Sequence, residues 1–211
     1  MTSPTPDPEP TYADRVFRST PGMAAGALML ALVAWMGVDA LVSGAGRTPW
    51  WGVAGLLLVV PLIVAFTLRP AVYVNDDRLR IRNPFRTITV PWGAVADVRA
   101  GYSSEVFTQK GAKYQLWAVP VSLRQRKRAA RRQTIAAQDD PHGRTSVTAD
   151  VSDSTSRLAP ADRTVAELRD LAERSASRPG AQGEPQVRWA YEILAPAVAG
   201  AVFLAVLMAT G

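Results

Sequence analysis

The chain has 211 residues, 48% of them hydrophobic, and a formal net charge of +6 at pH 7. It contains no cysteine, which excludes disulfides, thiolate metal sites, iron–sulfur clusters and cysteine nucleophiles. Its one histidine, His142, lies in a polar stretch, and a single imidazole excludes a multi-histidine metal site.

The first 21 residues are rich in proline, serine and threonine. They predict a disordered tail, because they carry too little apolar surface to offset the entropy of ordering. Three nearly uncharged apolar segments follow, at residues 23–42, 50–68 and 189–209. Each can cross about 30 Å of hydrocarbon as a helix, since a helix rises about 1.5 Å per residue. The first two predict a transmembrane hairpin over residues 22–69, and the last predicts a third transmembrane helix.

Two carboxylates lie near the ends of these apolar segments. Asp39 is close to the end of the first segment, and Glu192 falls in the first turn of the third. Both positions predict side chains at the membrane interface. An intramembrane enzyme or carrier would require the two carboxylates to meet inside the helical bundle.

The basic residues are unevenly distributed along the chain. Residues 69–133 contain 14 lysines and arginines and 4 acidic residues, whereas residues 1–68 contain 3 and 4. The loop between the first two apolar segments holds one basic residue, Arg47. The positive-inside rule therefore predicts a multi-pass protein of the cell membrane. It places residues 69–188 and the N-terminus in the cytoplasm and the C-terminus outside.

Residues 70–123 predict β-structure, because apolar and polar residues alternate with a period of two. In the run LRIR (residues 79–82), apolar and basic side chains point to opposite faces, and Asn75–Asp77 gives a turn signal before it. The pattern predicts an antiparallel sheet of four to five strands. The predicted core residues, all apolar and on one face of these strands, are Leu79, Ile81, Ile88, Val90, Trp92, Val95, Val98, Trp117 and Val119.

The run VYVNDDRLRIRNPFRTITVPWGAVADVRAG (residues 72–101) carries a family resemblance. It resembles the bacterial PH-domain family of small actinobacterial membrane proteins, the group named after low molecular weight protein antigen 6. The similar features are a strand ending in LRIRN, a short turn, and a run TITVPWGAV that leads to Val98-Arg99. Two membrane helices ahead of the domain also suit that group. The resemblance implies a PH-like fold, in which a strongly bent antiparallel sheet or barrel is capped by a C-terminal helix.

The segment after the β-rich block supplies a candidate for that helix. Residues 161–175 have apolar side chains at helical spacing, and Thr164-x-x-Glu167 predicts a capping box at their start. A free amphipathic linker helix is the alternative. Residues 124–160 form a basic and polar insertion, in which residues 145–151 are either one more strand or part of a disordered stretch. Residues 176–188 predict a plain linker to the third membrane helix.

A run of basic residues opens the insertion, and we call residues 124–132 the basic run. One interpretation is a solvated helical extension that also enforces the topology. The other is contact with anionic lipid headgroups. The run lacks interleaved aromatic residues, so nucleic acid is not expected as a partner. The residues predicted for lipid contact, all cationic, are Arg124, Arg126, Lys127, Arg128, Arg131 and Arg132.

Catalytic motifs are missing from the sequence. It contains no GxGxxG and no phosphate-binding loop followed by Lys-Ser/Thr, and Asp139-Asp140-Pro-His142 lies in a polar stretch without metal-ligand spacing. We therefore expect neither enzymatic activity nor a cofactor or metal. The sequence predicts a non-catalytic, membrane-anchored PH-like interaction module on the cytoplasmic face, which binds a protein partner or anionic lipid. The alternative is an accessory or regulatory subunit of a larger membrane assembly, such as a transporter or envelope complex.

Overall fold

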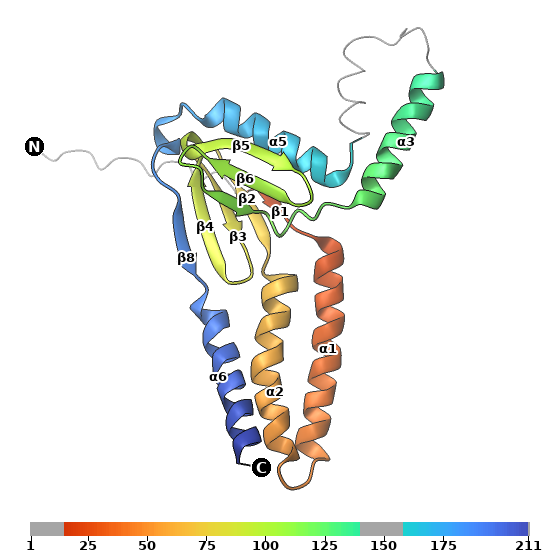
Figure 1. Cartoon of the computed structure of the whole chain (residues 1–211), viewed down its shortest axis with the longest axis vertical. Coiled ribbons are helices and arrows are strands. Elements are labelled where there is room, and N and C mark those ends of the chain that lie inside the picture. The colour runs from red at the N-terminus through yellow and green to blue at the C-terminus, as the bar shows by residue number, and fades with distance from the viewer. Residues whose placement is uncertain (1–14, 140–157, 211) are drawn as a thin grey trace, which may run out of the picture.

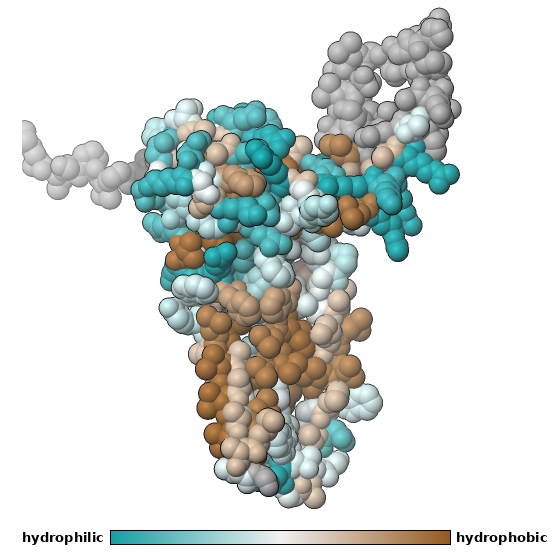
Figure 2. Space-filling model, in the orientation of Figure 1, coloured by the Kyte–Doolittle hydropathy of each residue, from teal (hydrophilic) through white to brown (hydrophobic). Residues whose placement is uncertain are grey.

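The computed structural model describes residues 15–139 and 158–210. It consists of a helical bundle with a β-rich domain at one end (Figure 1). Among the described residues, three helices are long and apolar enough to cross a membrane: α1 (Thr20–Val42), α2 (Thr48–Ile63), which continues as the π-helical turn η1 (Val64–Leu68), and α6 (Tyr191–Ala209). Hydrophobic residues cover most of the bundle, and hydrophilic residues cover most of the domain (Figure 2).

Helix α2 lies between α1 and α6, and glycines allow both neighbours to approach it closely. Gly26 of α1 packs against η1, where an added Cβ would lie 2.1 Å from the Thr67 hydroxyl oxygen. Gly200 of α6 packs on α2, where an added Cβ would lie 2.5 Å from a backbone nitrogen. At the far end of the bundle, Arg47 donates hydrogen bonds to the backbone and hydroxyl oxygens of Thr210 at 2.8 and 2.7 Å. The three helices therefore pack as one unit.

The domain contains two antiparallel sheets. The larger has the order β1-β2-β3-β4-β8, with strands β1 (Arg15–Phe17), β2 (Ala71–Val74), β3 (Arg78–Arg82), β4 (Arg86–Pro91) and β8 (Gln186–Trp189). The smaller has the order β5-β6-β7, with strands β5 (Val95–Ala100), β6 (Ser104–Thr108) and β7 (Lys113–Gln115). Two short 3-10 turns, η2 (Trp92–Ala94) and η3 (Pro179–Ala181), and two further helices, α3 (Leu123–Asp139) and α5 (Pro160–Ser175), complete the described elements.

The core lies between the two sheets and α5, which covers the smaller sheet. The predicted core residues that the structure buries are Leu79, Ile81, Ile88, Val90, Trp92, Val95, Val98 and Val119. Trp92 is fully buried, and its indole N–H donates to the Asn75 backbone oxygen at 2.8 Å, which satisfies its one polar atom. Trp117 departs from the prediction, because 43% of it is exposed. The strand ends at Gln115, so the alternation does not continue to Trp117 and Leu116 is buried instead.

The two edge strands of the larger sheet lie where the sequence predicted a disordered tail and a linker. Residues 15–17 belong to β1 rather than to a disordered tail, and Ser19 caps α1 by accepting a hydrogen bond from the Gly22 nitrogen at 3.3 Å. Residues 186–189 form β8 rather than a linker or the start of a membrane helix. Strands β2 and β4 would otherwise expose unpaired backbone groups along their outer edges, and these two segments satisfy them.

Helix α5 forms where a helix was predicted, but it begins differently. Pro160 occupies its first turn, a position where proline is favoured because no hydrogen-bond donor is lost. Thr164 lies inside the helix, and its hydroxyl donates to the Pro160 backbone oxygen at 3.1 Å, so the predicted capping box is wrong. Val165 and Leu168 face the domain core. Residues 145–151, for which a strand and a disordered stretch were the two alternatives, lie outside the described residues, as does His142.

Candidate functional site

A basic pocket of about 490 Å³ lies on the face of the larger sheet that points away from the core. We call it the arginine cradle. Its lining is polar apart from one tryptophan and consists of Arg69, Tyr73, Arg78, Arg80, Arg82, Thr87, Thr89, Arg188, Trp189 and Glu192. Strand β3 alternates between the two faces, so Leu79 and Ile81 enter the core while the neighbouring arginines face the pocket.

The register of the sheet brings these side chains together in two rows. Tyr73 of β2 pairs with Arg80 of β3, which pairs with Thr89 of β4. In the next row on the same face, Arg82 pairs with Thr87, which pairs with Arg188 of β8. Directly opposed residues in antiparallel strands have Cβ atoms about 5 Å apart. The first row therefore places one guanidinium group between two hydroxyl groups, and the second places one hydroxyl group between two guanidinium groups.

Tyr73 organises the first row. The Arg80 guanidinium lies over its ring at 4.7 Å from the centroid. Its phenol oxygen accepts hydrogen bonds from Arg18 at 2.9 Å and from Arg82 at 3.2 Å. Burial raises the pKa of Tyr73, but the hydrogen bonds from Arg82 and Arg18, together with their positive charges, outweigh it and hold the pKa below its ordinary value. The phenol oxygen of Tyr73 therefore accepts hydrogen bonds from two cationic side chains, which favour its ionised form.

Arg69 joins the cradle to the helical bundle. It follows directly after η1, and its side chain is only 6% exposed. Its Nε donates to the Asn83 backbone oxygen at 3.1 Å, and its two terminal nitrogens reach Glu192 at 2.7 Å and the Thr87 hydroxyl at 3.3 Å. One guanidinium group thus connects the end of α2, the turn between β3 and β4, and the first turn of α6.

The two membrane-segment carboxylates do not form a common site. Glu192 lies at the end of α6 that adjoins the domain, where it pairs with Arg69. Asp39 lies near the other end of the bundle, because α1 begins at the domain and runs away from it (Figure 1). The structure thus separates the pair that an intramembrane enzyme or carrier would require.

Three aromatic side chains lie close together where the helical bundle meets the domain, which we call the junction. Phe66 of η1 packs edge-on against Phe85, in the turn between β3 and β4, with ring centroids 5.3 Å apart. Trp117 packs on the other side of Phe66 at 5.5 Å. Trp117 and Phe66 both keep more than two-fifths of their surface exposed. Aromatic side chains with exposed edges at the end of an apolar helix are typical of a membrane–water interface.

The basic run lies elsewhere and is only partly anchored. It forms most of the first half of α3, which leaves the domain and runs away from the helical bundle (Figure 1). Arg126 turns inward, where it pairs with Asp162 and donates to the backbone oxygens of Ala100 and Gly101 at 2.7 and 2.9 Å. Arg126 therefore fastens α3 to the domain.

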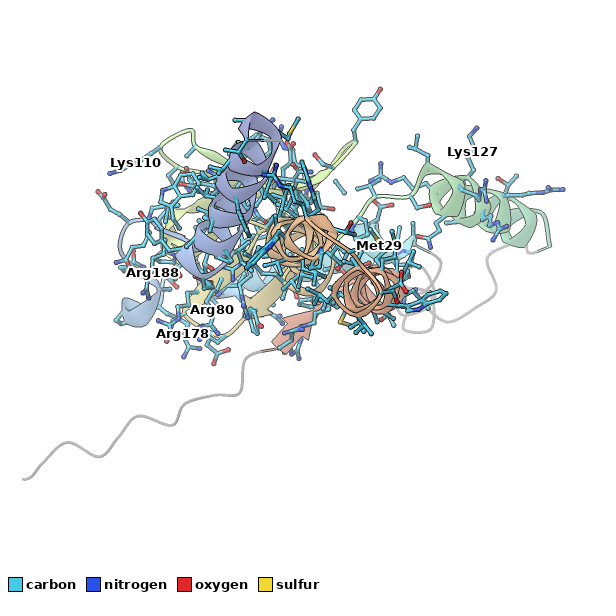
Figure 3. The ribbon with its side chains drawn as sticks, turned by 90° about the horizontal axis from the view of Figure 1, so that it is seen from below. Met29, Arg80, Lys110, Lys127, Arg178 and Arg188 are labelled. Atoms are coloured by element: carbon cyan, nitrogen blue, oxygen red, sulfur yellow. The ribbon has the colours of Figure 1, made fainter. Side chains whose placement is uncertain are left out.

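The other residues of the run take no part in the cradle. Arg124, Lys127, Arg128 and Arg131 are exposed together along one stretch of α3, and the side chain of Arg132 lies outside the described residues. Viewed from below, Lys127 lies on the opposite side of the bundle from Arg80 and Arg188 (Figure 3). The structure thus has two basic surfaces rather than one.

Sequence reasoning used the arginines of β3 to orient the chain and to assign the polar face of a strand, but it did not bring them together with β8. The available signal was the alternation of arginine on β3 with threonine on β4 across a short turn, which fixes their register. Strand β8 gave no such signal, because it is separated from β4 by more than ninety residues.

The lining of the cradle has the composition of an anion-binding surface. Five guanidinium groups and one carboxylate line it, which gives a formal charge of +4, and hydroxyl groups lie between them. Among the described residues, no group of three or more histidine or acidic side chains is arranged to hold a metal ion.

Comparison with known proteins bears on the domain. Residues 69–182, more than half of the chain, match the family described as bacterial PH domain. No curated protein and no solved structure matches the chain. The match confirms the resemblance seen in the sequence, and it covers β2 to β7, α3, α5 and η3. Strands β1 and β8 and most of the bundle lie outside it, so the cradle combines family residues with three that follow the match. The chain belongs to the bacterial PH domain family.

Proposed function

We propose that the chain is a non-catalytic, membrane-anchored interaction module that holds its PH domain against the cytoplasmic face of the membrane. One observation carries this proposal: three strands of a single sheet connect directly to the three apolar helices. Two residues separate β1 from α1, two separate η1 from β2, and one separates β8 from α6. A linker of one or two residues allows little rotation, so the domain and the bundle are fixed in orientation.

The side chains at the junction between the helical bundle and the domain support a membrane surface at that depth. Phe66 and Trp117 provide aromatic side chains of the interfacial kind, and Arg69 neutralises Glu192 at the end of the apolar helices. The cytoplasmic orientation rests on the excess of basic residues in the domain over the loop at the far end of the bundle, where Arg47 is the one cation. The PH-domain family is generally non-catalytic, in keeping with an interaction role.

Topology reporters test the proposal. A reporter fused after Gly211 should report an extracytoplasmic position, and the same reporter inserted near Asp140 should report a cytoplasmic one. The protein should also stay with the membrane fraction after alkaline carbonate washing. A cytoplasmic signal at Gly211, or release by carbonate, would overturn the proposal.

A groove in the bundle favours a second candidate, an accessory subunit of a larger membrane assembly. The groove has a volume of about 280 Å³ and runs between α1 and α2. Its lining includes Gly55, where an added Cβ would meet nothing within 4 Å, whereas Gly37 and Gly52 pack against the opposite helix of the hairpin. The adjacent Trp35 is 72% exposed. Small residues let a further helix approach closely within a membrane. A partner helix seated there would make the bundle, rather than the domain, the main contact.

Substitution in the groove separates the two candidates. An added Cβ at Gly55 meets nothing within 4 Å, so Gly55→Leu should occupy part of the groove while the protein stays folded. Val198→Leu, at an exposed position of α6, is the matched control. Loss of a co-purified membrane partner in Gly55→Leu alone would establish the accessory role. Retention of every partner in both variants would reject the groove as a docking site.

A further inference from the structure

We propose that the arginine cradle binds the phosphate group of an anionic lipid headgroup from the leaflet that adjoins the domain. This inference rests on the proposed function, because the apolar helices must cross the membrane for the cradle to lie at headgroup depth. It assigns lipid recognition to the sheet face rather than to the basic run.

The second row of the cradle supplies the donors that a phosphate requires. Arg82 and Arg188 are the two register partners of Thr87, one on each side of it. Guanidinium groups donate pairs of parallel hydrogen bonds to phosphate oxygens, and a threonine hydroxyl adds a further donor between them. A phosphate seated over Thr87 would therefore meet donors from three neighbouring strands.

The cradle carries more positive charge than its own carboxylate can neutralise. Glu192 is the one acidic residue in the lining, and it accepts a hydrogen bond from Arg69 at 2.7 Å. Arg69 is itself almost fully buried, whereas Glu192 is 63% exposed and also attracts Arg82. One carboxylate cannot neutralise five guanidinium groups, so net positive charge remains for an external anion, which is attracted most strongly in a partly enclosed site of low effective dielectric.

The position of the cradle favours a lipid over a free phosphate compound. Its lower boundary consists of Arg69, at the end of α2, and Glu192, in the first turn of α6. Trp189 lines the same edge and is 54% exposed. A tryptophan beside cationic residues at a helix end suits the boundary between headgroups and acyl chains. Figure 3 shows Arg80 and Arg188 on the same side of the bundle. A lipid standing beside the bundle there could raise its headgroup into the cradle.

The test uses the full chain in neutral detergent micelles and measures bound lipid by native mass spectrometry. The probes are phosphatidylglycerol, phosphatidylcholine and soluble glycerol phosphate. We expect retention of phosphatidylglycerol, little phosphatidylcholine, and no displacement by an equal concentration of glycerol phosphate. The double variant R82Q/R188Q should lower phosphatidylglycerol occupancy about tenfold or more, because charge-assisted hydrogen bonds to the phosphate are lost.

Two further variants distinguish a specific phosphate-binding site from nonspecific attraction to positive charge. R124Q/R131Q removes the same two charges from the basic run and should change occupancy by less than about twofold. R82K/R188K keeps the charges but loses the paired donors, and it should fall between the wild type and R82Q/R188Q. Arg188→Gln alone changes an exposed edge-strand position, so it tests binding independently of any effect on folding.

Three results would overturn the proposal: equal occupancy by the two lipids, an equal loss in R124Q/R131Q, or displacement of lipid by glycerol phosphate. The last would identify a soluble phosphate compound as the ligand. Lipid occupancy in micelles does not depend on which side of the membrane the domain faces. Failure of the headgroup site therefore appears in this measurement, and failure of the proposed orientation appears in the topology reporters.

Discussion

The arginines of the cradle come from paired strands and a helix end, whereas those of the basic run come from one helix that leaves the domain. In the cradle, the hydrogen-bonded register sets which side chains are neighbours, Tyr73 contacts Arg80 and Arg82, and Arg69 is held by Glu192. In the basic run, Arg126 contacts the body of the domain through hydrogen bonds to both backbone and carboxylate oxygens.

The two basic surfaces therefore differ in how their cations are arranged, and not only in how many cations they contain. The basic run has six cations in nine residues, and Arg124, Lys127, Arg128 and Arg131 share one face of α3, because residues three and four apart in a helix are neighbours. The cradle draws its cations from positions 69 to 188, and the sheet directs them to one surface where threonine hydroxyls lie between them. The exposed face of the basic run has no such hydroxyl donors, so the cradle is the better candidate site for a single phosphate.

The largest effect should follow from removing the group that fixes the cradle to the bundle. Arg69→Met leaves the Asn83 carbonyl and Glu192 without their shared donor. We expect a loss of about 2–3 kcal/mol in the free energy of unfolding, below the cost of breaking a fully buried ion pair, since Glu192 is 63% exposed and can be hydrated. Denaturant unfolding in detergent, followed by tryptophan fluorescence, measures it.

Arg78→Met is the matched control for Arg69→Met. Arg78 is an exposed arginine of the same cradle, so its substitution should change stability by no more than about 0.5 kcal/mol. If both variants lost the same stability, Arg69 would be one surface charge among several and the cradle would have no internal support.

A smaller and more local effect is expected where the basic run is attached. Arg126→Gln removes the ion pair with Asp162 and weakens the hydrogen bonds to the turn after β5, so α3 should open more readily. The pair is about one-quarter exposed, and we expect a cost of about 1 kcal/mol. Amide hydrogen exchange should speed up along α3 while the exchange of β3 and β4 stays constant.

Arg124→Gln removes a charge two residues away, at an exposed position, and should leave exchange along α3 unchanged. A cycle with Asp162→Asn gives the coupling energy between the two side chains. No coupling between them would show that Asp162 contributes nothing and that Arg126 holds α3 through its hydrogen bonds to the backbone oxygens of Ala100 and Gly101.

Local patterns predicted the elements whose signals lie within a few residues. Long apolar segments gave the three helices, period-two alternation placed Leu79 and Ile81 in the core, and helical spacing gave α5. The bacterial PH domain family was also recognisable from a run of thirty residues in the sequence. Each of these signals depends on neighbours in sequence, which is the information that a single chain contains directly.

Pairings between distant segments were not predictable in the same way. Strands β1 and β8 are short, and they become strands because β2 and β4 offer open edges, far away in sequence. The cradle depends on that pairing, since Arg188 reaches it only through the register of β8. Trp117 was misplaced for a related reason: its alternation is continuous with β7, but the chain turns after Gln115 and carries the ring to Phe66.

The smallest effect concerns the ionisation of Tyr73. Burial raises its pKa, but the hydrogen bonds and charges of Arg82 and Arg18 together lower it by a larger amount. The folded-state pKa therefore lies below the value of about 10 in the unfolded chain. An acid with a lowered pKa stabilises the fold only when ionised. Its contribution is therefore absent at low pH, grows as pH rises through the folded pKa, and is complete above about 10. Relative to Tyr73→Phe, the wild type should gain stability over that interval.

Unfolding of both proteins at a series of alkaline pH values measures this gain, and ultraviolet difference absorbance follows the phenolate directly. Tyr102→Phe is the matched control, because Tyr102 is 96% exposed and its loss should not change the pH dependence. A wild type that lost stability relative to Tyr73→Phe in this interval would mean that burial prevails over the arginines at Tyr73. The cradle would then hold less effective positive charge than its composition indicates. In that case an anion would bind no more tightly to the cradle than to the exposed arginines of α3.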